Sequence, residues 1–188
     1  MKAALALLLV LLPTPALAQA TATATAASAG CGDSAAKFDV KNDRHKHPLR
    51  QPAEGKALVY FLEDDSMFAS VFKPTTRVGV DGSWVGATHG DSYFYFSVDP
   101  GEHHLCAGWQ SEENWNFAHQ AAAAHFTARA GDVFYFRVRN IYSKEWLASI
   151  DLEPVDSDEA VLLMSTFSFS SSRPKPDSSA APPPSGMI

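Results

Sequence analysis

Short apolar runs separated by turn-forming residues recur through the middle of the chain. The run 57–62 (ALVYFL) is unbroken and rich in β-branched and aromatic residues, which favours a buried strand over a helix. Residues 92–98 (SYFYFSV) carry aromatics on both alternating faces, as a strand covered on both sides would. The alternation along 133–140 predicts a half-buried antiparallel strand. Further strands are expected at 75–80, 83–87, 103–109 and 147–155.

Turn signals separate these runs. Asp81-Gly82 joins two β-prone segments and predicts a type I′ hairpin, because both central residues of that turn need positive φ. Asp99-Pro100-Gly101 and Ala130-Gly131-Asp132 have the composition of two further turns. Segment 121–130 is ambiguous, since its alanines favour a helix whereas the alternation along 124–128 favours a strand.

Helical signals are few. The loop between 63 and 74 has an apolar spacing that indicates a short helical turn, formed by Met67, Phe68, Val71 and Phe72. Asp156 as N-cap, with Glu159 three residues later, forms a capping box and predicts a helix over about 157–165. Together these elements predict a mainly β domain: an antiparallel β-sandwich or open barrel of about seven to eight short strands with one short C-terminal helix.

The first residues have the pattern of a secretory signal peptide. A basic Lys2 precedes an apolar run over 3–12, and Ala16-Leu17-Ala18 provides an A-x-A cleavage site. The run is about ten residues long, too short to span a bilayer of roughly 30 Å. We therefore predict a signal peptide at 1–18, cleaved after Ala18; the alternative is an uncleaved interfacial anchor. The mature protein is expected to be periplasmic or secreted, with no transmembrane segment.

Both ends of the mature chain have low-complexity composition. Residues 19–37 are rich in Ala, Thr and Ser and predict a flexible leader. Residues 168–188 are mostly Ser, Pro and Ala, which predicts a disordered tail because such a segment buries little apolar surface. The folded β-sandwich domain is therefore expected over 38–167, a length that supports one core.

The net charge of the mature chain limits the kinds of partner that the protein is expected to bind. Without residues 1–18 the chain has 14 basic and 21 acidic residues, a net charge of −7 with histidine neutral. Nucleic-acid binding needs clustered Lys and Arg, so we exclude it, and docking on an anionic membrane surface is disfavoured. The partner could be an unidentified protein or an envelope glycan, and the sequence leaves the oligomeric state open.

Two cysteines remain after cleavage, Cys31 and Cys106. An oxidising compartment converts paired thiols to disulfides, so we predict a Cys31–Cys106 bond that fastens the leader to the domain. One alternative is lipidation of Cys31, because the preceding Ser28-Ala29-Gly30 loosely matches a lipobox. Ser28 is not a bulky aliphatic residue, however, and Cys31 lies far beyond the apolar run. The other alternative is two free thiols.

The order of three segments resembles a known family. They are 78–86 (VGVDGSWVG), 92–105 (SYFYFSVDPGEHHL) and 130–137 (AGDVFYFR). Over about 57–155 the chain is similar to prokaryotic exported proteins assigned only to a domain of unknown function, many of them small lipoproteins, and to PEGA-type surface modules. The resemblance implies a β-sandwich, placement outside the cytoplasm and no established activity. This chain differs from the lipoprotein members by its A-x-A cleavage site.

No motif for metal binding or catalysis is found. His103 and His104 are adjacent, so on a strand they point to opposite faces, and His45 and His47 lie in a polar stretch without accompanying ligands. No G-x-S-x-G motif occurs, since the segment 82–86 has Trp84 at the nucleophile position. The carboxylates Asp64 and Asp65 follow a strand end and are read as solvated turn residues. We predict no catalytic residue, no metal site and no cofactor.

Aromatic residues are the remaining feature. Candidates for stacking on a ligand are Trp84, Trp109, Trp115, Tyr93 and Tyr95. The simpler interpretation is that they cover the core. We therefore expect an exported, non-enzymatic module that binds a partner or contributes structure in the cell envelope. The alternatives are a carbohydrate- or peptidoglycan-binding module that uses exposed aromatics, and an uncharacterised hydrolase.

Overall fold

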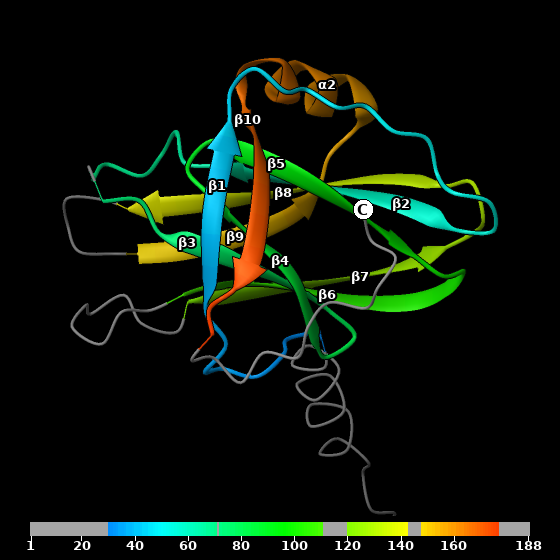
Figure 1. Ribbon diagram of the computed structural model, residues 1–188, viewed down its shortest axis with the longest axis horizontal. Helices are drawn as coiled ribbons and strands as arrows, with labels where there is room; N and C mark the ends of the chain where they lie inside the picture. Colours follow the sequence, from blue (N-terminus) through cyan, green and yellow to red (C-terminus); the bar gives the residue numbers. More distant parts are fainter. Residues whose placement is uncertain (1–29, 71, 111–119, 143–147, 177–188) are drawn as a thin grey trace, which may run out of the picture.

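The strands form two sheets that pack face to face, with one helix on the outer side of the larger sheet. The computed structural model describes residues 30–70, 72–110, 120–142 and 148–176. Figure 1 shows three layers: α2 (Ser157–Thr166) at the top, β2 (Ala57–Asp64) and β8 (Val133–Tyr142) in the middle, and β6 (Gly101–Trp109) below. The predicted mainly β fold with a short helix near the C-terminus is confirmed.

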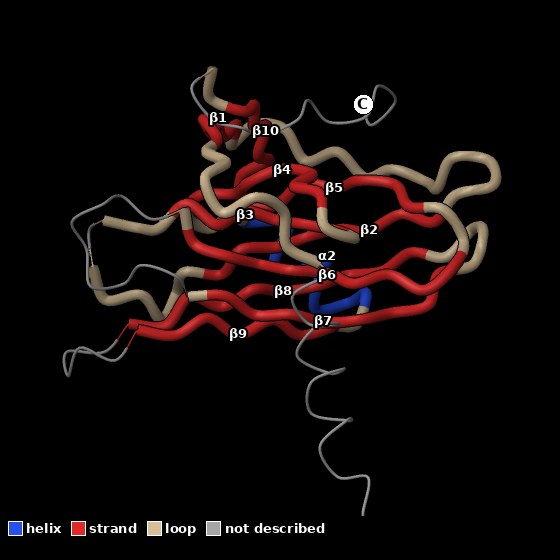
Figure 2. Tube along the Cα trace, turned by 90° about the horizontal axis from the view of Figure 1, so that it is seen from below, coloured by secondary structure: helices blue, strands red, loops and turns tan. Residues whose placement is uncertain are grey.

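Seven more strands complete the two sheets. They are β1 (Phe38–Asp43), β3 (Thr75–Val80), β4 (Ser83–His89), β5 (Ser92–Val98), β7 (Ala121–Ala128), β9 (Ala148–Pro154) and β10 (Ser168–Pro174). The larger sheet has the order β1-β10-β5-β2-β8-β9, and the smaller sheet has the order β4-β3-β6-β7. Figure 2 looks from below through the strands, with α2 on the far side. The described part of the chain thus has ten strands rather than seven or eight.

The larger sheet is mixed, so the prediction of a purely antiparallel sandwich is wrong for it. β2 runs parallel to β8, with Phe61 opposite Phe136, and β10 runs parallel to the start of β5. Between β2 and β8 the chain crosses to the smaller sheet twice, and its second return brings it back in the direction of β2. The smaller sheet is antiparallel throughout.

The local predictions have mixed outcomes. Asp81 and Gly82 both have positive φ, 50° and 81°, and form the predicted hairpin turn between β3 and β4. The ambiguous segment 121–130 contains strand β7. The backbone of this strand pairs with β6 in antiparallel orientation, as the alternation of its side chains favours. The helical turn expected in the loop after β2 is absent from the described residues; instead Phe68 forms an isolated bridge with Tyr142. Residue 71 lies outside the described residues.

Helix α2 begins as the capping signal predicts. The carboxylate of Asp156 accepts hydrogen bonds from the backbone N–H groups of Asp158 and Glu159. The carboxylate of Glu159 forms an ion pair with Arg137 on β8, which ties the first turn of the helix to the sheet. Ala160 and Met164 are the buried residues of the helix and pack on the outer face of β2. Within the described ranges, no helix reaches the length and apolar character needed to cross a bilayer.

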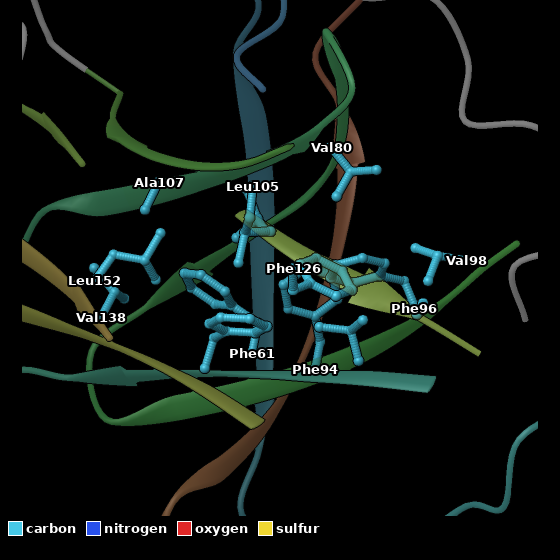
Figure 3. Packing of buried hydrophobic residues seen from close by; sticks show 14 of the residues in the cluster. Phe61, Val80, Phe94, Phe96, Val98, Leu105, Ala107, Phe126, Val138 and Leu152 are labelled. Atoms are coloured by element: carbon cyan, nitrogen blue, oxygen red, sulfur yellow. The ribbon is translucent and has the colours of Figure 1, made fainter. Parts of the chain in front are cut away.

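The main core lies between the two sheets. Figure 3 shows Phe61 and Phe94 from the larger sheet close to Leu105 and Phe126 from the smaller one. Phe126 also contacts Phe136, with ring centroids 5.2 Å apart. Aromatic rings therefore fill the space between the sheets, and burying them supplies the main driving force for folding.

The predicted tail begins too early, because residues 168–174 form strand β10. Residues 169–174 of this strand pair with β1, and its first two residues pair with the first two residues of β5. In Figure 1 the β1–β10 pair stands nearly upright against the other strands. The hydroxyl of Ser172 accepts a hydrogen bond from the N–H of Ala87 on β4, so this pair also links the two sheets. Serine hydroxyls bonded in this way supply contacts that a composition-based prediction of disorder does not count.

A substitution of Phe169 on β10 tests whether this strand contributes to core packing. Its ring lies 5.6 Å from that of Tyr93 and 5.7 Å from that of Tyr95. We expect Phe169→Ala to lower the free energy of unfolding by about 3 kcal/mol, measured by urea denaturation. The exposed Arg173→Ala on the same strand is the control and should change it by less than about 0.5 kcal/mol. Equal effects of the two substitutions would show that β10 contributes no core packing.

Candidate functional site

Two acidic side chains lie inside the sandwich at the end of β2. The inward-facing positions of β2 are Ala57, Val59 and Phe61, which belong to the main core, and then Glu63. Asp65 follows two residues later; Glu63 is fully buried and Asp65 is only 1% exposed. The interpretation of Asp64 and Asp65 as solvated turn residues is therefore wrong, because both are enclosed by the end of the sandwich.

Asn140 connects the two carboxylates. Its side-chain N–H₂ donates to Glu63 Oε1 and to Asp65 Oδ1, each at 2.6 Å. The indole N–H of Trp109 donates to the Asn140 side-chain oxygen at 2.6 Å, which fixes the orientation of the amide. The hydroxyl of Thr76 donates to Glu63 Oε1 at 2.7 Å. We call these five residues the buried polar cluster. They come from β2 and the residue after it, β3, β6 and β8.

Each carboxylate of the buried polar cluster keeps one oxygen without a hydrogen bond, Oε2 of Glu63 and Oδ2 of Asp65. Burial raises the pKa of Glu63 well above its ordinary value, and repulsion from Asp65 raises it further. Burial likewise raises the pKa of Asp65 to about 6, against the opposing hydrogen bond from Asn140. Glu63 is therefore favoured as the neutral acid, and Asp65 changes charge at about pH 6.

The segment after Asp65 closes this end of the sandwich. Phe68 is buried and meets Trp109 edge-on, with ring centroids 5.7 Å apart. The ammonium of Lys73 donates to the backbone carbonyls of Asp65 and Phe68 at 2.7 and 2.9 Å, so it holds the segment in place. Met67 and Phe72 are exposed on the outside of the same segment. Glu63 is thus enclosed, with its carboxyl group bonded to Thr76 and Asn140.

The predicted disulfide between Cys31 and Cys106 is present, with Cα atoms 5.1 Å apart. It joins the leader to β6 on the outer face of the smaller sheet. The guanidinium of Arg77 donates to the carbonyls of Ser34 and Ala36, both at 2.8 Å, and lies over the Trp84 ring at 4.5 Å. The prediction of a flexible leader over 19–37 is thus wrong for residues 30–37, which are fastened by the disulfide and by these contacts.

The aromatic candidates do not gather on one exposed face. Trp84, Trp109 and Tyr93 are buried, at 9%, 4% and 0% exposure, so these three cannot form a surface for stacking on a ligand. Tyr95 is partly exposed on the outer face of the larger sheet, where its ring lies 5.6 Å from that of Tyr60. Trp115 lies outside the described residues. Trp109 instead serves the buried polar cluster through its indole N–H.

The histidines occupy separate places. His103 contacts the Asp81 carboxylate at 2.6 Å and the Asp99 carbonyl at 2.7 Å, so both ring nitrogens face acceptors. Burial would lower the pKa of His103, but these two hydrogen bonds outweigh it and raise the pKa. His47 contacts the Met164 carbonyl, and His45 lines a surface cavity. Among the described residues, no group of three or more His, Cys, Asp or Glu side chains could hold a metal ion.

That cavity, of about 700 Å³, opens beside the buried polar cluster. It is lined by residues 41–45 and 89–91 together with Thr166 and Ser168. Asp91 connects the two regions, because it lines the cavity and its carboxylate accepts a hydrogen bond from the backbone N–H of Asp65 at 2.8 Å.

Sequence reasoning missed Glu63, Thr76 and Asn140 as parts of one cluster. One signal was available: Glu63 has the same parity as the inward-facing Val59 and Phe61, so a continued strand carries it into the core. Asn140 likewise has the same parity as the inward-facing Phe136 and Val138 of β8. Their convergence depends on the parallel pairing of β2 with β8, which the sequence does not reveal.

The fold and the buried polar cluster define a disulfide-containing β-sandwich domain with an acidic group enclosed in its interior. A family model described as a protein of unknown function (DUF2846) matches residues 53–148, just over half of the chain. The protein belongs to this family, which confirms that part of the expected resemblance. No curated protein and no solved structure matches the chain.

The buried polar cluster predicts how stability depends on pH. A carboxyl group whose pKa is raised in the folded state binds its proton more tightly there, so its contribution to stability falls as pH rises above the unfolded value. For Asp65 this loss occurs between about pH 4 and 6, and Glu63 extends it to higher pH. We expect Glu63→Gln to unfold at a higher temperature than the unsubstituted protein at pH 8, because the amide carries no charge and keeps an oxygen for Thr76 and Asn140.

Calorimetry at pH 5 and pH 8 measures this effect. His103 contributes a slope of the same sign, since its stabilisation is complete below about 6.5 and is lost as pH rises through its raised pKa. The difference between the variant and the unsubstituted protein therefore isolates Glu63. The exposed Glu102→Gln is the matched control and should leave the profile unchanged. A destabilisation by Glu63→Gln that is as large at pH 8 as at pH 5 would contradict the raised pKa.

Proposed function

We propose that this protein is an exported, non-enzymatic module of the cell envelope that acts by binding a partner or by contributing structure. The observation that carries the proposal is the Cys31–Cys106 disulfide. Such bonds persist in oxidising compartments and are rare where cellular thiols are kept reduced. The A-x-A site at Ala16–Ala18 provides the matching export signal.

The non-enzymatic part of the proposal rests on the placement of the ionisable groups. The most strongly perturbed carboxyl group, Glu63, is fully buried and bonded to Thr76 and Asn140. A general acid or base must come within hydrogen-bond distance of its substrate, and the enclosure of Glu63 prevents this. The enclosure of Glu63 therefore favours a structural role over catalysis.

Export and oxidation can be measured together. We expect the full chain, expressed in a Gram-negative bacterium, to be recovered outside the cytoplasm with its N-terminus at Gln19. Intact mass after alkylation without reductant should show no modified cysteine. The control is a chain lacking residues 2–18, which should remain in the cytoplasm with both thiols open to alkylation after unfolding. Cytoplasmic recovery of the full chain with Met1 retained would overturn the proposal, and an N-terminal lipid on Cys31 would rule out the disulfide that carries it.

The bond should also support the fold. The chain-entropy model assigns about 4 kcal/mol to a bond that closes a loop of 75 residues. We expect Cys31→Ala/Cys106→Ala to lower the free energy of unfolding by roughly that amount in urea denaturation. Reduction of the unsubstituted protein is the parallel measurement and should give a similar loss. A loss below about 1 kcal/mol in both would show that the noncovalent contacts of Arg77 hold the leader without help.

A further inference from the structure

The cavity beside the buried polar cluster has the size and the lining of a site for a small polar molecule. Its volume of about 700 Å³ falls in the range of ligand pockets. It lies between the end of β1, the turn from β4 to β5 and the end of α2, near the upper end of β1 in Figure 1. Its lining is polar or charged throughout, apart from Gly90, so hydrogen bonds and charge determine what it accepts.

Hydrogen bonds from β1 to β4 and β10 hold the walls of the cavity in place. The side-chain N–H₂ of Asn42 on β1 donates to the carbonyl of His89 on β4 at 2.7 Å. The Asn42 oxygen accepts from the hydroxyl of Ser170 at 2.6 Å, and that hydroxyl lies 3.0 Å from the hydroxyl of Ser92. Gly90 has a φ of 68°, which allows the sharp turn that forms one wall. These bonds fix the two sides before any ligand arrives.

The acidic groups of the lining are already engaged by the protein. The carboxylate of Asp43 accepts a hydrogen bond from the backbone N–H of His45 at 2.9 Å and lies 3.6 Å from the ammonium of Lys46. The carboxylate of Asp91 accepts from the N–H of Asp65 at 2.8 Å. The charge of Asp43 therefore has a cationic partner, whereas the Asp91 carboxylate is held by a backbone hydrogen bond.

The basic side chains of Lys41 and Arg44 in the lining are free to bind a ligand. Within the described part of the chain, the side chains of Lys41 and Arg44 make no hydrogen bond or ion pair. His89 turns Nδ1 toward the carbonyl of Pro74 at 3.0 Å, which uses only one of its two ring nitrogens. Two permanent positive charges thus face the cavity without an internal partner. A carboxylate or a phosphate can accept several charge-assisted hydrogen bonds from such donors.

We propose that this cavity binds a small organic anion through Lys41 and Arg44. The ligand class is a sugar-sized molecule that carries one carboxylate or phosphate group. The inference deepens the binding part of the proposed function, and it does not depend on where the protein resides.

Titration of the purified protein, followed by NMR of its backbone amides, tests this directly. The probes are glucose 6-phosphate and glucuronate, with glucose as the uncharged control of matched size. We expect saturable shifts at residues 41–45 and 89–91 with at least one of the two anions and none with glucose. The anion that binds more tightly distinguishes a phosphate from a carboxylate ligand. No saturable shift with either anion, or equal shifts with glucose, would overturn the proposal.

Charge-removing variants then assign the site. Lys41→Gln/Arg44→Gln should weaken anion binding about tenfold or more, because two charge-assisted contacts are lost. The control Lys56→Gln/Arg129→Gln removes the same charge near the opposite end of β2 and should leave binding within twofold. If the double variant unfolds, Arg44→Gln alone, at an exposed position, provides the same comparison. Equal weakening of anion binding by the two double variants would show that the effect comes from the overall charge of the protein. It would overturn the assignment of the site to Lys41 and Arg44. Because the assay uses purified protein, failed export and failed anion binding are separate results.

Discussion

The burial of β2 on both faces is the constraint on which the rest of the structure depends. Its inward-facing side chains fill the space between the sheets, while Leu58, Tyr60 and Leu62 lie under α2 on the other face. A strand has a side-chain period of two, so no residue can change face without shifting the whole register. Glu63 is therefore carried into the interior by the apolar residues before it. The hydrogen bonds from Thr76 and Asn140 then become necessary, because a buried polar group without partners is costly.

The outer faces of the two sheets are covered in different ways. The larger sheet is covered by an amphipathic element, α2, through Ala160 and Met164. The smaller sheet is covered by the irregular leader, whose backbone carbonyls must be satisfied by side chains. Arg77 and Trp84 supply those donors. A covalent bond is thus placed where the covering segment has little apolar surface of its own.

How much of the structure could be predicted depends on how far apart in the sequence the interacting residues are. The hairpin at Asp81-Gly82 and the start of α2 at Asp156 depend on neighbouring residues, and both were predicted correctly. The disulfide was inferred from compartment and cysteine number. β10 was missed because its serines are stabilised by partners far away in sequence, such as Asn42 and Ala87. The buried polar cluster was missed for the same reason: it requires residues from four different strands to meet.

The pairing of β1 with β10 has a consequence for the order of assembly. These strands are the first and last of the described chain, and Val40 lies opposite Ser172. The edge of the larger sheet therefore cannot close until nearly the whole domain has been synthesised. Contacts so distant in sequence form slowly, since the loop between them must first be ordered. The β1–β10 pair is therefore expected to form late, after the strands between them have been ordered.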